Sequence, residues 1–193
     1  MLRSTLVILL LAFSASASAE GFSYNYLTLG YGNTDFDFVG ADGDGIGLGG
    51  SFAFTPSIHG FASWETVDLD VNIPLVGNVS VDTTRLRAGV GYNTGLSDAL
   101  DMYARLSYEG IDFDVPGGDD NGYGLGIGVR YRAMDELELN AGIKYVDYSD
   151  LGDDTGVEVG GVYNFNDTWS LGLRGEFSDD VSTYTVSGRF YFR

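Results

Sequence analysis

The sequence lacks several residues on which common protein chemistries depend. It has no cysteine, which excludes a disulfide framework, a lipid-bearing cysteine and a thiolate nucleophile. It has one histidine, His59, and one lysine, Lys144, against 28 acidic residues, and its net charge is −18. This acidity argues against nucleic acid as a partner.

Long apolar runs are also scarce. The longest, over residues 6–13, follows Arg3 and precedes small residues that end at Ala19. This order of basic, apolar and small residues predicts a signal peptide over residues 1–19, with cleavage after Ala19. The run is too short to cross a bilayer as a helix, which takes about 20 apolar residues. The expected mature chain, residues 20–193, has the length of one domain.

Alternation of apolar and polar residues is abundant. In the stretch TTRLRAGVGYN (83–93), Leu86 and Val90 alternate with Arg85 and Arg87. A period of two is typical of a β-strand whose two faces meet different surroundings. About ten such segments are expected, at 22–33, 43–55, 58–67, 82–94, 99–111, 121–132, 137–147, 155–165, 168–177 and 182–192.

The connections between these segments alternate in length. Those at 55–57, 94–98, 133–136 and 164–168 are short, and most of the others are longer and rich in aspartate. Short turns at one end and long loops at the other are the layout of an outer-membrane barrel. We therefore predict an all-β fold, a transmembrane antiparallel up-and-down β-barrel of about ten strands over residues 20–193, with eight strands as the alternative.

The charges indicate which face of each strand meets lipid. The apolar phase carries no charge in any strand, and the other phase holds every basic residue of the mature chain except Arg193. Lysine or arginine facing the middle of a bilayer costs about 2–4 kcal/mol, so we expect the charged phase to line the lumen. The expected lumen charge network is Glu65, Arg85, Arg87, Asp101, Arg105, Glu109, Arg130, Arg132, Glu138, Lys144, Glu158, Arg174, Glu176 and Arg189.

Opposite charges in a narrow lumen are expected to pair, because an unpaired buried charge is costly. Glu65 is expected to pair with Arg85 or a close diagonal neighbour, and inward glycines are expected to leave room for arginines. Two lumen states stay open, a sealed salt-bridge network and a narrow water-filled pore lined by the same residues.

Aromatic residues near the strand ends fit the interfacial girdles of a membrane barrel. They are Tyr24, Tyr26, Trp64, Tyr92, Tyr108, Tyr131, Tyr163 and Trp169. The last strand resembles the C-terminal assembly signal of outer-membrane proteins, although Phe192 is penultimate and Arg193 follows it. The expected partners are outer-membrane lipid and, through this strand, the barrel-assembly machinery, and we expect a monomer.

The long loops carry aspartates from Asp35 to Asp180 and neither lysine nor arginine. They either keep the rim soluble or bind divalent cations weakly, because clustered carboxylates are oxygen ligands for calcium. The stretch ADGDG (41–45) lacks the glutamate of a calcium loop, so no specific metal site and no cofactor is predicted. An apolar loop tip is a candidate partner contact; it comprises Ile73, Pro74, Leu75 and Val76.

No catalytic residue is predicted. Barrel proteases of the omptin type and barrel enzymes that modify lipid A need a histidine near the extracellular side. His59 instead follows the short turn at 55–57, at the opposite end, and is expected to be an interfacial or lumen residue.

Four stretches carry a family resemblance: EGFSYNY (20–26), ADGDGIGLGGSFAF (41–54), RAGVGYN (87–93) and FNDTWSLGLRGEF (165–177). With them the chain resembles the small outer-membrane β-barrel proteins of Gram-negative bacteria, and more closely the Ax-twenty-one-type family of xanthomonads and relatives. The resemblance implies a barrel of the outer membrane or its vesicles with a role in virulence, biofilm or signalling. It brings no catalytic residues.

The expected function is therefore non-enzymatic, in envelope structure or in surface interaction through acidic extracellular loops. The alternatives are a small cation-preferring diffusion pore and an adhesin-like binder that acts through loop 68–82.

Overall fold

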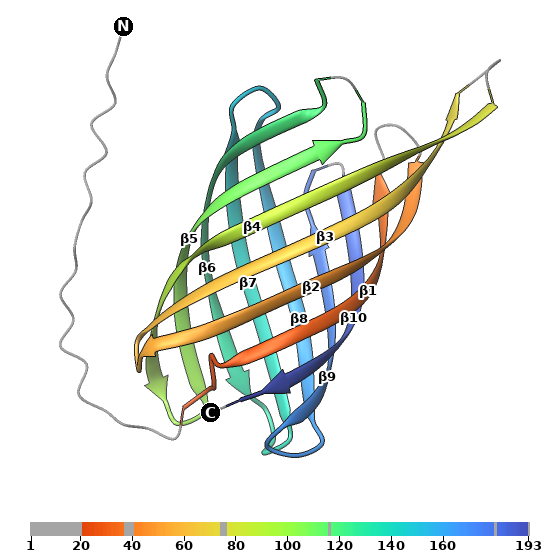
Figure 1. Cartoon of the computed structure of the whole chain (residues 1–193). Helices are drawn as coiled ribbons and strands as arrows, with labels where there is room; N and C mark the ends of the chain where they lie inside the picture. Colours follow the sequence, from red (N-terminus) through yellow and green to blue (C-terminus); the bar gives the residue numbers. More distant parts are fainter. Residues whose placement is uncertain (1–20, 37–40, 74–76, 116, 180, 193) are drawn as a thin grey trace, which may run out of the picture.

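The computed structural model describes residues 21–36, 41–73, 77–115, 117–179 and 181–192. These residues form ten β-strands that wind around one axis (Figure 1). The strands are β1 (Tyr26–Phe36), β2 (Ala41–Thr55), β3 (Ile58–Ile73), β4 (Gly77–Ser97), β5 (Leu100–Phe113), β6 (Asp119–Arg132), β7 (Leu137–Tyr148), β8 (Gly152–Asn164), β9 (Trp169–Phe177) and β10 (Val181–Tyr191). Within the described ranges, no helix is long and apolar enough to cross a membrane.

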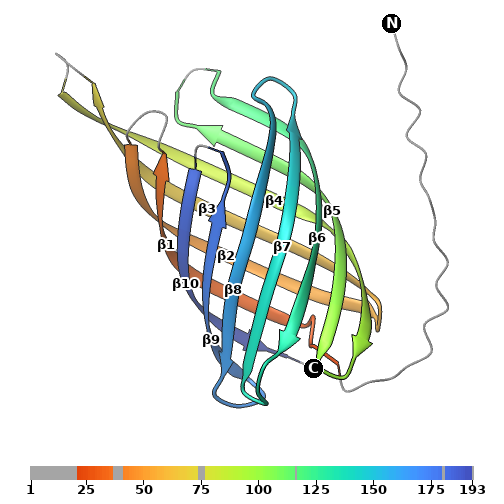
Figure 2. The same cartoon turned by 180° about the vertical axis from the view of Figure 1, so that it is seen from behind.

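The sheet closes on itself. Each strand pairs antiparallel with its neighbours in sequence, and β1 pairs with β10 from Tyr26 opposite Tyr191 to Phe36 opposite Val181. Tight turns join β2–β3, β4–β5, β6–β7 and β8–β9 at one end, which we call the short-turn end; the β6–β9 wall is seen best from behind (Figure 2). The predicted closed barrel of about ten strands is confirmed, and the alternative of eight is wrong.

The outer surface of the barrel is apolar and the inner surface is polar. Leu125 and Leu173 on the outside are 58% and 63% exposed, whereas Asp101 and Arg130 on the inside are 4% and 6% exposed. Water does not stabilise so large an apolar surface, but hydrocarbon does, and closure leaves no unpaired strand edge in it. The predicted orientation of the two faces is confirmed.

The chain enters the barrel differently from the prediction of a strand at 22–33. β1 begins at Tyr26, and residues 21–25, the N-terminal segment, turn into the short-turn end near the C-terminus (Figure 1). The Asn25 side chain accepts a hydrogen bond from the Ala53 backbone N–H at 2.7 Å, and the Asn25 carbonyl accepts one from the Phe192 N–H at 3.1 Å. Tyr24 is 4% exposed and Tyr26 lines the lumen, so their assignment to a lipid-facing girdle is wrong.

The predicted loop 68–82 is mostly strand. The pairing of β3 with β4 continues to Ile73 opposite Gly77, beyond the last pairs with β2 (at Asp70) and with β5 (at Thr83). The resulting β3–β4 hairpin projects past its neighbours (Figure 1). Of the predicted apolar tip, Ile73 ends β3, and Pro74, Leu75 and Val76 lie outside the described residues.

Candidate functional site in the barrel lumen

Glycines on the inner surface make room for long polar side chains of neighbouring strands. A Cβ atom added at Gly91 would fall on the ring of His59, and one added at Gly124 would lie 2.7 Å from Oε1 of Glu109. Only glycine permits such close approach. The prediction that these glycines accommodate arginines is wrong at both positions.

Half of the predicted lumen charges form two ion-pair clusters near the middle of the strands. We call these seven residues the central ion-pair layer: Glu65, Arg87, Glu109, Lys144, Glu158, Arg174 and Glu176. Two of the pairs cross the lumen. Arg174 on β9 lies 3.1 Å from Glu65 on β3, and Arg87 on β4 lies 3.7 Å from Glu176 on β9. These side chains bridge opposite walls of the barrel.

Within the layer, Glu176 and Glu109 each have more than one partner. Glu176 accepts a hydrogen bond from Lys144 at 3.1 Å in addition to its contact with Arg87. Glu109 accepts from the Nε of Arg87 at 3.1 Å and from the Ser107 hydroxyl at 2.7 Å. Such satisfied networks hold side chains in one arrangement, because a displaced partner leaves a charge unpaired.

The predicted partner of Glu65 needs correction. The β3–β4 register places Glu65 directly opposite Arg85, as expected. The Glu65 carboxylate nevertheless pairs with Arg174, and Arg85 forms no ion pair with another described residue. Contacts across a lumen depend on barrel diameter and strand tilt, which local sequence does not specify.

Two lumen arginines contact aromatic rings instead of carboxylates. The guanidinium carbon of Arg105 lies 4.4 Å from the ring centroid of Tyr103 and 5.1 Å from that of Phe61. The guanidinium carbon of Arg189 lies 4.2 Å from the ring centroid of Tyr26. Neither arginine forms an ion pair within the described part of the chain, so the expected pairing of all lumen charges is wrong here.

A second polar cluster lies at the short-turn end. Arg130 on β6 donates to both oxygens of Glu138 on β7, at 2.7 and 2.9 Å, and to the carbonyl of Ser23 at 3.1 Å. The guanidinium carbon also lies 4.6 Å from the ring centroid of Tyr24 and 4.8 Å from that of Phe22. Arg130 therefore fixes the N-terminal segment to the far wall.

Tyr24 adds a second link across this mouth. Its hydroxyl donates a hydrogen bond of 2.8 Å to Asp101 on β5. Burial raises the pKa of Tyr24 above its ordinary value, and the Asp101 carboxylate acts in the same direction. The hydroxyl therefore stays protonated and available as a donor.

Two more predicted residues are placed at this end. His59 is 0% exposed; its Nδ1 lies 3.1 Å from Oδ1 of Asn93, and its ring stacks on Tyr24 with centroids 4.2 Å apart. Arg132 contacts the Phe22 ring and donates to the carbonyl of Asp98 at 3.4 Å. We call Phe22, Tyr24, His59, Asp101, Arg130 and Glu138 the mouth cluster. Sequence reasoning missed Tyr24 as a lumen residue, because its partners are distant in sequence.

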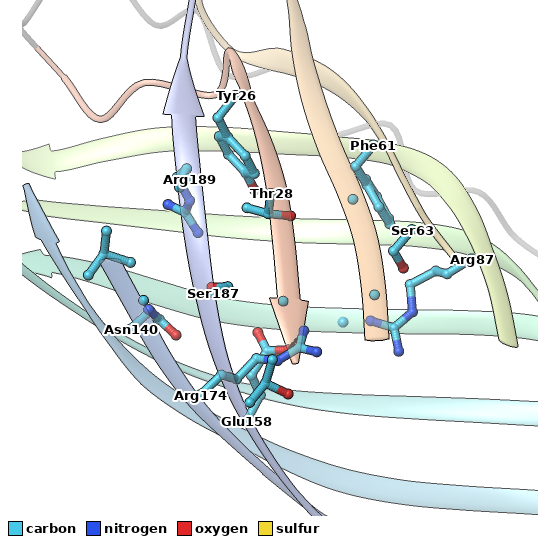
Figure 3. A pocket seen from close by; sticks show the side chains of 18 of the residues that line it. Tyr26, Thr28, Phe61, Ser63, Arg87, Asn140, Glu158, Arg174, Ser187 and Arg189 are labelled. Atoms are coloured by element: carbon cyan, nitrogen blue, oxygen red, sulfur yellow. Dashed lines mark ion pairs between the residues drawn. The ribbon is translucent and has the colours of Figure 1, made fainter. Parts of the chain in front are cut away.

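A cavity of about 210 Å³ is lined by Arg130 and Glu138 of the mouth cluster and by residues of the central ion-pair layer. Figure 3 shows Arg87, Glu158 and Arg174 of that layer at the cavity. Among its lining residues, six are basic and three are acidic: Arg87, Arg105, Arg130, Lys144, Arg174 and Arg189, against Glu65, Glu138 and Glu158. No group of three or more histidine, aspartate or glutamate side chains that can hold a metal ion occurs among the described residues.

Comparison with known proteins decides the family. A sequence profile of the outer membrane protein beta-barrel domain matches residues 5–165. The chain belongs to this outer-membrane β-barrel family. Its location is therefore the outer membrane of a Gram-negative bacterium. None of the curated protein sequences matches the chain.

Solved structures share the fold of this outer-membrane barrel. KdgM porin, in complex with disordered oligogalacturonate, is 14% identical, with 86% of this chain and 99% of that chain covered and a TM-score of 0.53. NanC porin is 12% identical, with 86% of this chain and 100% of that chain covered and a TM-score of 0.56. An outer membrane channel from Pseudomonas putida F1 is 9% identical, with 92% of this chain and 99% of that chain covered and a TM-score of 0.51. At these identities the similarity shows the fold alone.

Family membership orients the outer-membrane barrel. Barrels of this kind place short turns in the periplasm and longer loops outside the cell. The mouth cluster therefore lies at the periplasmic mouth, and the β3–β4 hairpin extends from the extracellular side.

Proposed function

We propose that this outer-membrane barrel is non-enzymatic, has a sealed lumen, and acts in envelope structure or in contacts at the cell surface. The observation that carries the proposal is the two ion pairs that cross the lumen, Glu65–Arg174 and Arg87–Glu176. A diffusion channel needs a continuous water-filled path, and these side chains occupy it from opposite walls.

The periplasmic mouth supports the same proposal. The N-terminal segment lies across it, with Tyr24 bonded to Asp101 and the Ser23 carbonyl bonded to Arg130. Displacing such groups is costly, because buried donors, acceptors and charges would lose their partners. These contacts support closure at a second level, in addition to the central ion-pair layer.

Planar-bilayer recording of the purified mature protein tests the sealed lumen. We expect no single-channel steps above the baseline of the protein-free bilayer. Heat-modifiable migration on gels, measured on the same preparation, verifies that the barrel is folded. Regular channel steps from folded protein would contradict the proposal.

The surface role is assigned to the β3–β4 hairpin, with residues 68–82 as the adhesin-like element. Its projection beyond β2 and β5 supports this assignment. The resemblance to the Ax-twenty-one-type family points to a virulence-associated or signalling role for such contacts.

Shortening the hairpin tests this role. Replacing residues 70–80 by Asn-Gly keeps Leu69 opposite Val81 and supplies a two-residue turn. We expect cells carrying this variant to lose adherence to host-cell or bacterial surfaces, and a matched replacement of the β7–β8 turn at 149–151 to leave it unchanged. Equal adherence of both variants and the unaltered protein would contradict the assignment.

A narrow pore is the second candidate, and the cavity of about 210 Å³ is the observation that favours it. Opening would require the N-terminal segment to leave the mouth. Deleting residues 20–24 is then expected to produce channel steps, whereas deleting only Glu20 and Gly21 is not. The acidic loops would favour cations, whereas the excess of basic residues in the cavity would favour anions. The reversal potential in a salt gradient shows whether the loops or the cavity set the ion selectivity.

The C-terminal strand is the proposed contact with the barrel-assembly machinery, and the protein is proposed to be a monomer. The Phe192 ring stacks against Phe52 with centroids 6.4 Å apart, at the edge where β10 ends. Phe192→Ala is expected to lower the amount of folded protein in outer-membrane fractions without changing refolding in detergent. A parallel loss in detergent would point to stability instead.

A further inference from the structure

The cavity in the lumen contains two arginines that no described carboxylate neutralises by an ion pair. Four of its basic residues pair with at least one carboxylate: Arg87, Arg130, Lys144 and Arg174. Arg105 and Arg189 line the same cavity and form no ion pair with any described residue. An enclosed charge without a counter-charge is costly, which makes these two arginines candidates for ligand binding.

Their aromatic contacts leave hydrogen-bond donors free. Rings of Tyr103 and Tyr26 lie near the two guanidinium groups, but the N–H donors of a guanidinium project in its own plane. The Nε of Arg105 is buried and has no hydrogen-bond partner in the described structure. Arg189 donates through Nη1 to the Tyr191 hydroxyl at 3.1 Å. Arginine donors without acceptors match the oxygen atoms of an oxyanion.

We propose that this cavity binds a small oxyanion of phosphate size, held by Arg105 and Arg189. Neutral donors from Thr28, Ser63 and Ser187 line the same space and supply further hydrogen bonds (Figure 3). About 210 Å³ accommodates such an ion with a few waters, but not a chain of several sugar units. The inference does not require the barrel to conduct.

Access to the site is restricted on both sides. The central ion-pair layer separates the cavity from the extracellular rim, whose aspartates also repel anions. The N-terminal segment covers the periplasmic side. The oxyanion therefore enters during folding or when this segment moves, and its exchange with solvent is slow. For this reason, binding is tested on protein that has been refolded in the presence of the ion.

Crystals of the mature protein refolded in selenate give a direct test, because selenium supplies an anomalous signal in a phosphate-like ion. We expect an anomalous peak inside the cavity with oxygen atoms in contact with Arg105 and Arg189. A peak found only on the outer surface, or no peak at all, would overturn the proposal.

Retention of radiolabelled inorganic phosphate after refolding and gel filtration measures the contribution of each arginine. Arg105→Gln and Arg189→Gln are each expected to weaken retention about ten- to hundredfold, the loss of a charge-assisted hydrogen bond. Arg85→Gln is the matched control, since Arg85 is also a lumen arginine that forms no ion pair with a described residue, but it does not line the cavity. Equal retention by all four proteins would contradict the site.

A folding control completes the design. If Arg105→Gln does not fold, Arg105→Lys keeps the charge but removes the planar set of donors. We expect Arg105→Lys to fold and to retain phosphate less tightly than the unaltered protein. Undiminished retention would show that Arg105 does not hold the ion.

Discussion

Glu65 on β3 and Arg174 on β9 form an ion pair of 3.1 Å, although β2, β1 and β10 separate their strands along the sheet. Arg130 and Glu138 form a pair of 2.7 Å between neighbouring strands at the periplasmic mouth. The side chains of Glu65 and Arg174 are 31% and 32% exposed, and those of Arg130 and Glu138 are 7% and 9% exposed. Lumen water therefore reaches the first pair much more than the second.

This difference predicts unequal energies for two matched substitutions. Glu138→Gln leaves a buried arginine charge unpaired and is expected to lower the free energy of unfolding by about 3–5 kcal/mol. Glu65→Gln is expected to lower it by about 0–1 kcal/mol, since water can solvate Arg174. Urea unfolding in lipid vesicles, followed by tryptophan fluorescence, measures both. Similar losses for the two variants would refute the difference in hydration.

Tyr24 predicts a loss of stability at alkaline pH. Its pKa is raised from 10.0, so above about pH 10 the unfolded chain releases this proton while the folded protein retains it. The free energy of unfolding therefore falls as the pH rises above about 10, and this contribution is fully present below that pH. Tyr24→Phe is expected to show a smaller alkaline decrease, measured by urea unfolding. Tyr131→Phe, on the exposed outer surface, is the control, and an identical decrease in both variants would argue against a buried Tyr24.

Removing the Tyr24 hydroxyl is also expected to lower the free energy of unfolding at neutral pH. Tyr24→Phe leaves the Asp101 carboxylate without its donor and is expected to cost about 1–3 kcal/mol of unfolding free energy. The unfolding midpoint in urea at neutral pH reports the change. An unchanged midpoint would mean that water replaces the hydroxyl at Asp101.

Two glycines on β4 are expected to respond unequally to the same substitution. A Cβ at Gly91 would overlap the His59 ring, whereas a Cβ at Gly95 would have its nearest neighbouring heavy atom at 3.9 Å. Gly91→Ala is expected to destabilise the barrel by about 1–3 kcal/mol through overpacking, and Gly95→Ala to have little effect. Thermal unfolding of both variants in detergent measures the difference. A Gly91→Ala variant more stable than Gly95→Ala would contradict the prediction.

The lipid-facing surface predicts sensitivity to charge rather than to size. Leu106 is 52% exposed on the outer surface, and Leu106→Arg is expected to cost about 2–4 kcal/mol near the middle of the bilayer. Leu106→Phe keeps this surface apolar and is expected to fold into vesicles as well as the unaltered protein. Folding yields on heat-modifiability gels compare them, and equal yields would contradict the assigned face.

The alternation of residues predicted most of the barrel for a physical reason. A one-residue slip in a strand such as 83–93 would place Arg85 and Arg87 in lipid, so the sequence specifies the face strongly. Alternation alone does not show where a segment leaves the barrel sheet or extends beyond its neighbouring strands. Residues 22–25 leave the sheet to fill the mouth. Residues 68–73 continue as strand through their pairing with β4, although only 71–73 pair with β4 alone.

The candidate site was less predictable than the fold. The inward phase identified the charged residues that form the central ion-pair layer, but not the Glu65–Arg174 contact, which depends on the closed shape of the barrel. Tyr24 and Asp101 are 77 residues apart in sequence, and no local pattern links them. The glycines were recognisable as inward-facing, but the side chains they accommodate were identified only from the packing.

The N-terminal segment has a consequence for the order of assembly. Tyr24 precedes β1, and Asp101 lies on β5 across the lumen, so the two meet only after the sheet has curled and β1 approaches β10. Closing a contact over so many residues carries an entropic cost that favours its late formation. Phe22 and Tyr24 are therefore open to a protease with aromatic specificity in unfinished chains and protected in completed ones, so that resistance to cleavage there reports the last step of insertion.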